Sequence, residues 1–86
     1  MVSRSFVVFM LANGLSHSRV GLTTPRKLGK AVVRNRIRRR VREILRRSWD
    51  SIPSGKDIVV NPRSNASARE FDELKNELLT LLGAAA

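Results

Sequence analysis

The densest group of chemically active side chains in this sequence is a run of arginines near its middle. Residues 34–40 read RNRIRRR, and the stretch from 26 to 47 holds 11 of the 17 Lys and Arg residues with a single acid, Glu43. A guanidinium donates a fork of hydrogen bonds that matches phosphate oxygens, and it keeps its charge at neutral pH. A solvated charged face would mix glutamate with the cations, since arginines three or four residues apart on a helix repel one another. The run therefore predicts a phosphate backbone as its counter-charge, and charge alone does not decide between DNA and RNA.

Two lysines, Lys27 and Lys30, flank Leu28-Gly29 just ahead of this run. Glycine lets the backbone approach a ligand closely, and cations near the first amides of a helix favour an anion. The phosphate-loop pattern G-x-x-x-x-G-K-[ST] is absent, so nucleoside triphosphate binding is not predicted. A structural turn and a nucleic-acid contact explain this segment equally well.

Phe9 lies in an apolar stretch near the start of the chain, between Val7 and Leu11 at alternate positions. On an open sheet face, an aromatic ring at such a place stacks a nucleic-acid base. A buried core phenylalanine is the competing interpretation, and the pattern leaves both open.

Composition excludes several classes of site. The sequence has no cysteine and one histidine, so disulfides, Cys-ligated metals and two-His acid–base pairs are excluded. No carboxylate pair, nucleophile triad or metal cluster appears, so we predict no catalytic and no metal-ligating residue. The net charge of +10 indicates a polyanionic partner. The apolar stretch from Phe6 to Ala12 is far shorter than the roughly 20 residues of a membrane span, and we expect a soluble, cytoplasmic protein with no membrane partner.

Hydrophobic periodicity predicts the elements that must position these residues. Alternation indicates a strand over 4–12 that is apolar on both faces, with Phe9 on the face opposite to Phe6. Asn13-Gly14 predicts a turn, and residues 19–24 a second strand antiparallel to the first. From 31 to 49 a period of 3.6 residues predicts a helix that turns its arginines away from a sheet.

The C-terminal part adds a strand and a helix. A short buried strand is predicted over 57–61, ended by Pro62, and Ser67 with Glu70 fits a capping box for a final helix. Gly83 is expected to end that helix, and the alanines after it to fray. Residues 1–86 are thus predicted to form one α+β domain with the order β-β-α-β-α. Two helices cover one sheet face, so the other face of the first strand needs an N-terminal segment, a partner, or both.

Taken together, these segments resemble the protein subunit of bacterial ribonuclease P. Residues 27–39, KLGKAVVRNRIRR, match the family signature K-x-G-x-A-V-x-R-N-R-[IV]-[KR]-R without a gap, and VGLT precedes them at 20–23. A second block, DIVV at 57–60 followed by Arg63, is similar to the family's last strand. The resemblance extends from about residue 4 to residue 82.

The resemblance implies a fold like the second domain of ribosomal protein S5, with a left-handed βαβ crossover around the basic helix. It implies that the catalytic centre belongs to a large RNA, and that the protein helps this RNA to remove the 5′ leader from precursor tRNA. The implied partners are the catalytic RNA and the leader. No cofactor is expected on the protein, and Mg²⁺ is implied for the RNA-catalysed reaction.

The same resemblance implies which residues bind. The leader is expected in a cleft of the sheet on Val7, Phe9 and Thr23; the family commonly has tyrosine where this chain has Phe9, so stacking is retained and a hydroxyl contact is lost. The residues expected to bind RNA through their charge or hydrogen bonds are Arg26, Lys27, Lys30, Arg34, Asn35, Arg36, Arg38, Arg39 and Arg40.

The sequence departs from the family pattern at its start. The family begins with a helix whose aromatics line the other wall of the leader cleft, whereas Met1-Val2-Ser3 leads almost directly into the first strand. We expect a shortened chain whose uncovered sheet face pairs copies of the protein, and the strength of leader binding is left open. The alternative function is that of a structural ribosomal-type protein that binds folded rRNA and has no preference for precursor over mature tRNA.

Overall fold

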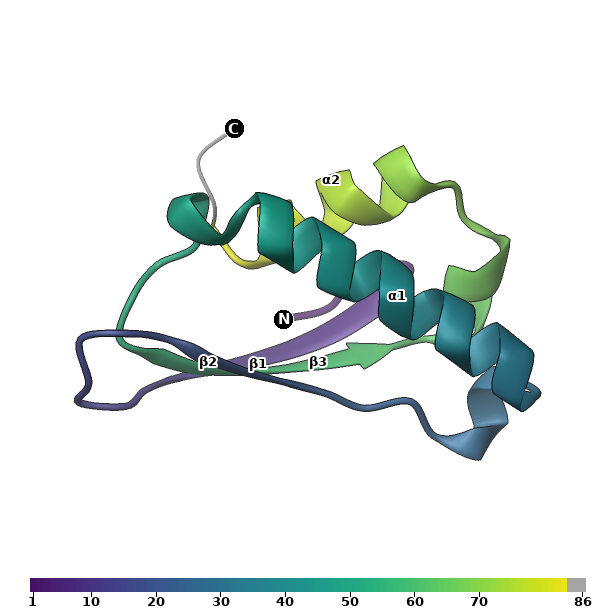
Figure 1. The fold of residues 1–86 in the computed structure, drawn as a ribbon, viewed down its shortest axis with the longest axis horizontal. Coiled ribbons are helices and arrows are strands. Elements are labelled where there is room, and N and C mark those ends of the chain that lie inside the picture. Colours follow the sequence, from purple (N-terminus) through teal and green to yellow (C-terminus); the bar gives the residue numbers. More distant parts are fainter. Residues whose placement is uncertain (84–86) are drawn as a thin grey trace.

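The computed structural model describes residues 1–83 and shows the predicted order β-β-α-β-α (Figure 1). The predicted fraying of residues 84–86 lies outside the described residues. The strands and helices are β1 (Phe6–Ala12), β2 (Arg19–Leu22), α1 (Ala31–Arg47), β3 (Lys56–Pro62) and α2 (Phe71–Leu81). Short 3₁₀ helices join them, namely η1 (Arg26–Leu28), η2 (Trp49–Ser51) and η3 (Ser64–Ala68). The predicted α+β class is confirmed.

β3 is the central strand of a three-stranded mixed sheet with the order β1-β3-β2. β1 pairs with β3 antiparallel, starting with Phe6 opposite Pro62, and β2 pairs with β3 parallel. β2 therefore runs antiparallel to β1, as predicted, but the two strands are separated by β3. β3 takes the central place because its Ile-Val-Val segment is apolar on both faces, whereas β2 is short and carries Arg19 and Gly21, which suit an edge strand.

α1 connects the parallel strands β2 and β3, so these three elements form a βαβ unit. Figure 1 shows α1 and α2 on the same side of the sheet. The apolar arc predicted for α1 is buried against that sheet face, and the left-handed sense of the crossover stays a prediction. The fully buried residues of the core include Phe6, Val8, Ile37, Val41, Ile44, Ile58, Val60, Ala66, Leu74, Leu78 and Leu82.

Local hydrogen bonds set element boundaries that differ from the predicted ones. β1 begins at Phe6 and not at Arg4, because the N–H and Oγ of Ser5 donate to the Glu77 carboxylate of α2, at 3.0 and 2.8 Å. α1 ends at Arg47 and not at residue 49, since the Ser48 N–H makes the last helical bond before the chain tightens into η2.

The predicted capping box of α2 is wrong in its residues. η3 takes up residues 64–68, so the Ser67 hydroxyl donates to the Ser64 carbonyl at 3.4 Å and is too far from α2 to cap it. The box is formed by Glu70 and Glu73, and the Glu70 N–H donates to the Glu73 carboxylate at 3.3 Å. Carboxylates serve this role because they accept from free first-turn amides. Gly83, with φ of +68°, follows the helix end as predicted.

The sheet face opposite the helices is open. In β1, Phe6 and Val8 are fully buried, while the intervening Phe9 is 60% exposed and Leu11 is 74% exposed. This confirms the predicted alternation and the uncovered apolar face. No helix within residues 1–83 is both long and apolar enough to cross a membrane.

Candidate nucleic-acid interface

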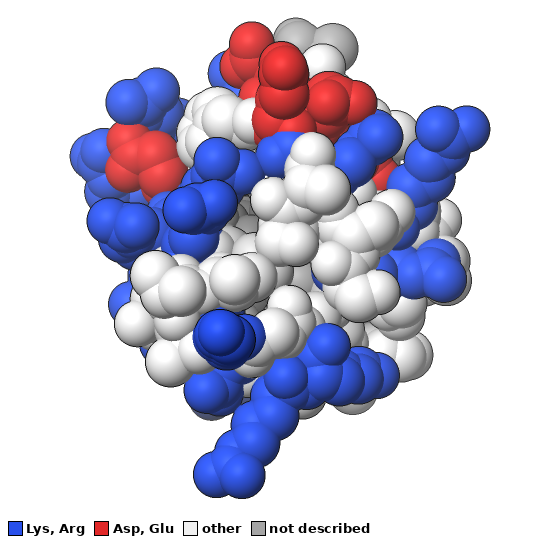
Figure 2. Space-filling model, turned by 90° about the vertical axis from the view of Figure 1, so that its right-hand side faces the viewer, with Lys and Arg blue, Asp and Glu red and all other residues white. Residues whose placement is uncertain are grey.

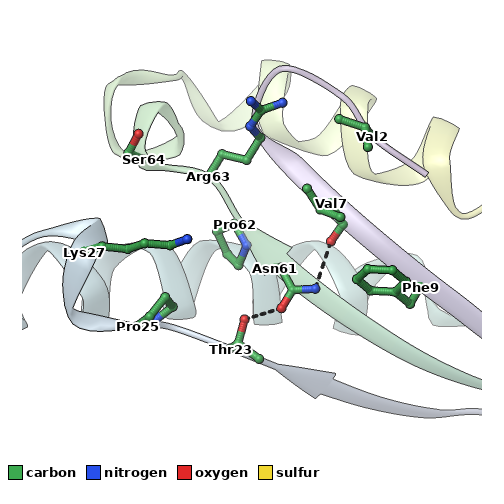
Figure 3. A pocket seen from close by; sticks show the side chains of 10 residues that line it. All are labelled: Val2, Val7, Phe9, Thr23, Pro25, Lys27, Asn61, Pro62, Arg63 and Ser64. Atoms are coloured by element: carbon green, nitrogen blue, oxygen red, sulfur yellow. Dashed lines mark hydrogen bonds between the residues drawn. The ribbon is translucent and has the colours of Figure 1, made fainter.

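A groove of about 790 Å³ lies on the open sheet face, at the end where β1 begins and β3 ends (Figure 3). β1 contributes Val7 and Phe9, and Thr23 follows the last residue of β2. The three residues predicted to bind a leader are thus brought together in one groove. Its complete lining is Val2, Val7, Phe9, Thr23, Pro25, Lys27, Asn61, Pro62, Arg63 and Ser64.

Strand pairing and hydrogen bonds fix the floor of this groove. The β1–β3 register places Val7 opposite Asn61, and the Thr23 N–H continues the β2 ladder by donating to Val60 at 3.1 Å. The Thr23 hydroxyl donates to Oδ1 of Asn61, and Nδ2 of Asn61 donates to the Val7 carbonyl at 3.4 Å (Figure 3). Asn61 therefore connects all three strands at the centre of the groove.

Positive charge lies at one side of the groove and no acid lines it. Lys27 of η1 and Arg63 after β3 supply the charge, and Arg63 is held by a hydrogen bond of 3.1 Å from Nη1 to the Ser3 carbonyl. The half-exposed ring of Phe9 offers a flat apolar surface nearby. Aromatic faces beside cations are the chemistry that binds single-stranded nucleic acid with little sequence preference.

Six lining residues are not among the predicted site residues, namely Val2, Pro25, Asn61, Pro62, Arg63 and Ser64. The sequence points to two of them. Arg63 follows the DIVV block, and Asn61 is the polar residue that ends an otherwise apolar strand. Only the pairing of β3 between β1 and β2 shows that both lie beside Phe9 and Thr23.

The arginines of α1 lie on the helix side of the molecule and differ in how they are held. Arg38 donates to Asn35 Oδ1 at 3.0 Å and to the hydroxyl of Thr24. This contact gives Asn35 a partner within the protein and ties α1 to the segment that carries Thr23. Arg36 and Arg39 are exposed, and their side chains make no hydrogen bond or ion pair with any residue from 1 to 83.

Two further arginines of this helix are half-buried. The Nε atom of Arg34 is buried without a hydrogen-bond partner among the described residues. Arg40 is oriented by a hydrogen bond of 2.9 Å from Nη1 to the Arg69 carbonyl. Arg69 in turn contacts the Glu77 carboxylate at 3.3 Å, so α1, the start of α2 and β1 are joined by one chain of polar contacts.

The Lys27–Lys30 segment is a structural turn that also presents charge. Gly29 has φ of +130°, and a Cβ there would lie 3.3 Å from Val33, so glycine is needed for the turn onto α1. Lys27 reaches the groove, while Arg26 and Lys30 are exposed beside it. Figure 2, which views this end of the molecule, shows Lys and Arg around an uncharged centre, with Asp and Glu gathered mainly at the top, where α2 lies.

Glu43, the one acid of α1, forms its ion pairs within the same helix. It pairs with Arg46 at 2.8 Å and with Arg47 at 2.6 Å. The hydrogen bond from Arg46 lowers the pKa of Glu43, against a smaller opposing effect of desolvation, so its charge is retained and balanced at the C-terminal end of α1. The N-terminal half of α1 has no such counter-charge within residues 1–83.

The groove does not offer a magnesium site. Mg²⁺ binds carboxylates and other oxygens in octahedral geometry, and it needs anionic groups near it. The groove combines Lys27 and Arg63 with one amide and hydroxyls, and no three of the described His, Asp and Glu residues lie close enough to share a metal. The groove residues therefore do not fit a bound Mg²⁺ ion.

Comparison with known proteins identifies the family. A family model described as Ribonuclease P matches residues 1–86. The chain belongs to the ribonuclease P protein family. It is 47% identical over 81 residues to the ribonuclease P protein component of Thermotoga maritima, covering 90% of this chain and 69% of that protein. It is 40% identical over 80 residues to the component of Streptococcus pneumoniae, covering 93% and 65%. The chain thus spans about two thirds of the length of these relatives.

Solved structures agree with this assignment. The RNase P protein from Thermotoga maritima, in complex with 1-(4-fluorophenyl)-2-thiourea, superposes with a TM-score of 0.90 at 42% identity, covering 100% of this chain and 84% of that one. The Staphylococcus aureus RNase P protein gives 0.85 at 34% identity, covering 96% and 76%. The family predicted from the RNR segment is confirmed. Membership implies a role in tRNA processing, as a subunit of a ribonuclease P complex that associates with RNase P RNA.

Proposed function

We propose that this ribonuclease P protein binds the catalytic RNA along α1 and holds the 5′ leader of precursor tRNA in the open groove. The observation that carries the proposal is the meeting of Val7, Phe9 and Thr23 in one groove beside Lys27. These residues come from β1, from the segment after β2 and from η1, and their assembly supplies an aromatic face, hydrogen-bonding groups and a cation at one place.

The exposed side of α1 supports the first half of the proposal. Arg36 and Arg39 have no counter-charge among residues 1–83, and Arg34 has an unpartnered buried Nε. Several unpaired guanidiniums on one helix destabilise it slightly by mutual repulsion, and a phosphate backbone removes that cost. Arg38 contributes a side chain whose orientation is set by its hydrogen bonds to Asn35 and Thr24.

Catalysis in this proposal belongs to the RNA. The side chains of the protein supply binding and orientation, because the groove residues include no carboxylate, no histidine and no cysteine. Magnesium acts on the RNA, and the cationic surface lowers the concentration that the RNA needs by neutralising phosphates. This places the protein in the bacterial cytoplasm, where precursor tRNA is processed.

The experiment that tests the proposal is precursor-tRNA cleavage by Thermotoga maritima ribonuclease P RNA at low magnesium, with and without this protein. We expect stimulation that depends on a single-stranded leader, and weaker binding of mature tRNA to the complex. Equal binding of precursor and mature tRNA would instead support the ribosomal-type alternative. Sedimentation of the free protein tests self-association through the exposed apolar face, which stays a prediction.

A further inference from the structure

A second hollow, of about 430 Å³, lies between the exposed side of α1 and the start of α2. Its volume is within the roughly 300–1,000 Å³ typical of small-molecule sites. The lining residues on α1 are spaced i, i+3, i+4 and i+7, so they form one face of the helix, and the first residue of α2 closes the hollow. The lining consists of Arg36, Arg39, Arg40, Glu43 and Phe71.

The charge of this hollow is positive despite the glutamate. Glu43 is paired with Arg46 and Arg47, which lie further along α1 and outside the hollow. Arg40 is fixed by its hydrogen bond to the Arg69 carbonyl. Arg36 and Arg39 remain exposed and unpaired within residues 1–83, so their guanidiniums are free to bind an anion.

Phe71 gives the hollow an aromatic wall. Its side chain packs in part against the hydrophobic core and is in part open to the hollow. An aromatic face beside arginines matches a nucleotide, which has both a planar base and a phosphate. A base-paired segment cannot use this wall, since its bases are stacked within the duplex.

We infer that this hollow binds one unpaired nucleotide of the RNA that lies along α1, with the base against Phe71 and a phosphate on Arg36 and Arg39. The inference rests on the proposed function, because the same RNA supplies the nucleotide. It adds a specific contact: α1 recognises a bulged or looped residue, and α2 takes part in the recognition.

The test uses Phe71→Leu and Phe71→Trp, with binding to Thermotoga maritima ribonuclease P RNA measured at several salt concentrations. We expect Phe71→Leu to weaken binding about tenfold and Phe71→Trp to retain it, because stacking needs an aromatic face. The salt dependence should stay unchanged in both, whereas Arg39→Ala should reduce its slope by about 0.7 to 0.9. Trp49→Leu is the matched control, since Trp49 is 40% exposed and lies outside the hollow.

Chemical probing of the RNA gives the second readout. One unpaired nucleotide should be protected by the wild-type protein and exposed again with Phe71→Leu, while the rest of the footprint stays the same. Unchanged affinity and footprint with Phe71→Leu would overturn the inference and leave the proposed function standing. Equal losses in the leucine and tryptophan variants, accompanied by lower thermal stability, would show that Phe71 is only a core residue. Failure of the wild-type protein to bind the RNA would overturn the proposed function itself.

Discussion

In the proposed function, the groove on the sheet and the exposed side of α1 both bind nucleic acid, but they offer it different chemistry. The groove has a fixed floor, in which Asn61 is hydrogen-bonded to Thr23 and Val7, with the ring of Phe9 beside it. The exposed side of α1 has long guanidiniums with few partners. Charge binds any phosphate chain, whereas a fixed array of apolar and polar groups distinguishes one strand conformation from another. Under the proposed function, we therefore expect α1 to supply affinity and the groove to supply selectivity.

The largest effect is expected from removing charge on α1. Arg34→Ala combined with Arg36→Ala should lower affinity for ribonuclease P RNA roughly tenfold or more, and should reduce the salt slope by about 0.7 to 0.9 for each lost phosphate contact. The ratio of precursor to mature tRNA affinity should not change. Filter binding over a salt series measures both quantities, with Arg19→Ala on the edge strand as a charge-loss control. An unchanged slope would show that α1 does not face RNA.

Phe9→Ala should lower the affinity for precursor tRNA and leave the affinity for ribonuclease P RNA unchanged. Loss of a stacked base costs about 1 to 3 kcal/mol, so affinity for precursor tRNA should fall about tenfold while affinity for the catalytic RNA is retained. Leu11→Ala is a matched control, because Leu11 lies on the same open face of β1 but outside the groove. Equal losses for precursor tRNA and catalytic RNA would contradict the division between the two surfaces.

A smaller effect is expected at the floor of the groove. Thr23→Val removes the donor to Asn61 Oδ1 and keeps the size of the side chain. A net hydrogen bond contributes about 0.5 to 1.5 kcal/mol, so leader preference should fall a few-fold and stability should change little. Leader-length series of precursor tRNA measure the preference, and Thr80→Val, at an exposed position of α2, is the control. No change in leader preference would mean that the floor need not be fixed.

The smallest effect is expected at Glu77 of α2. Its carboxylate contacts Ser5, just before β1, and Arg69, whose carbonyl accepts from Arg40 of α1. Burial alone raises the pKa of Glu77, but hydrogen bonds from Ser5 and Ser3 and the charge of Arg69 hold it below its usual range. Because the pKa is lowered in the folded state, the stabilisation is fully present above the pKa of the unfolded chain and is lost as the pH falls through the lowered value. Urea unfolding at pH 7 and pH 3 should show that Glu77→Gln destabilises the protein more at pH 7 than at pH 3. An equal loss at both values would exclude a charge effect, and Asp72→Asn is the exposed control.

The sequence predicts the helix side better than the groove. The apolar arc and the arginines of α1 follow from the positions of Ile37 and its neighbours, because helix periodicity is a local property. The alternation of Phe6 and Phe9 likewise follows from the local period of a strand.

The groove depends on pairing between distant segments, which local patterns do not specify. Asn61 and Arg63 join Phe9 only because β3 lies between β1 and β2. The trio of Val7, Phe9 and Thr23 was predicted from the family resemblance and not from periodicity. The capping error has a similar cause, since Ser67 and Glu70 both fit the pattern and the position of η3 decides which one begins α2.

The central place of β3 has a consequence for how the groove forms. Val7 pairs with Asn61, and Thr23 reaches the same residue, so no N-terminal hairpin can build the groove by itself. Contacts between segments so far apart form slowly, because a long loop must close before they are made. β3 leaves the ribosome only after the whole of α1, so the groove cannot form until the chain has been synthesised through β3.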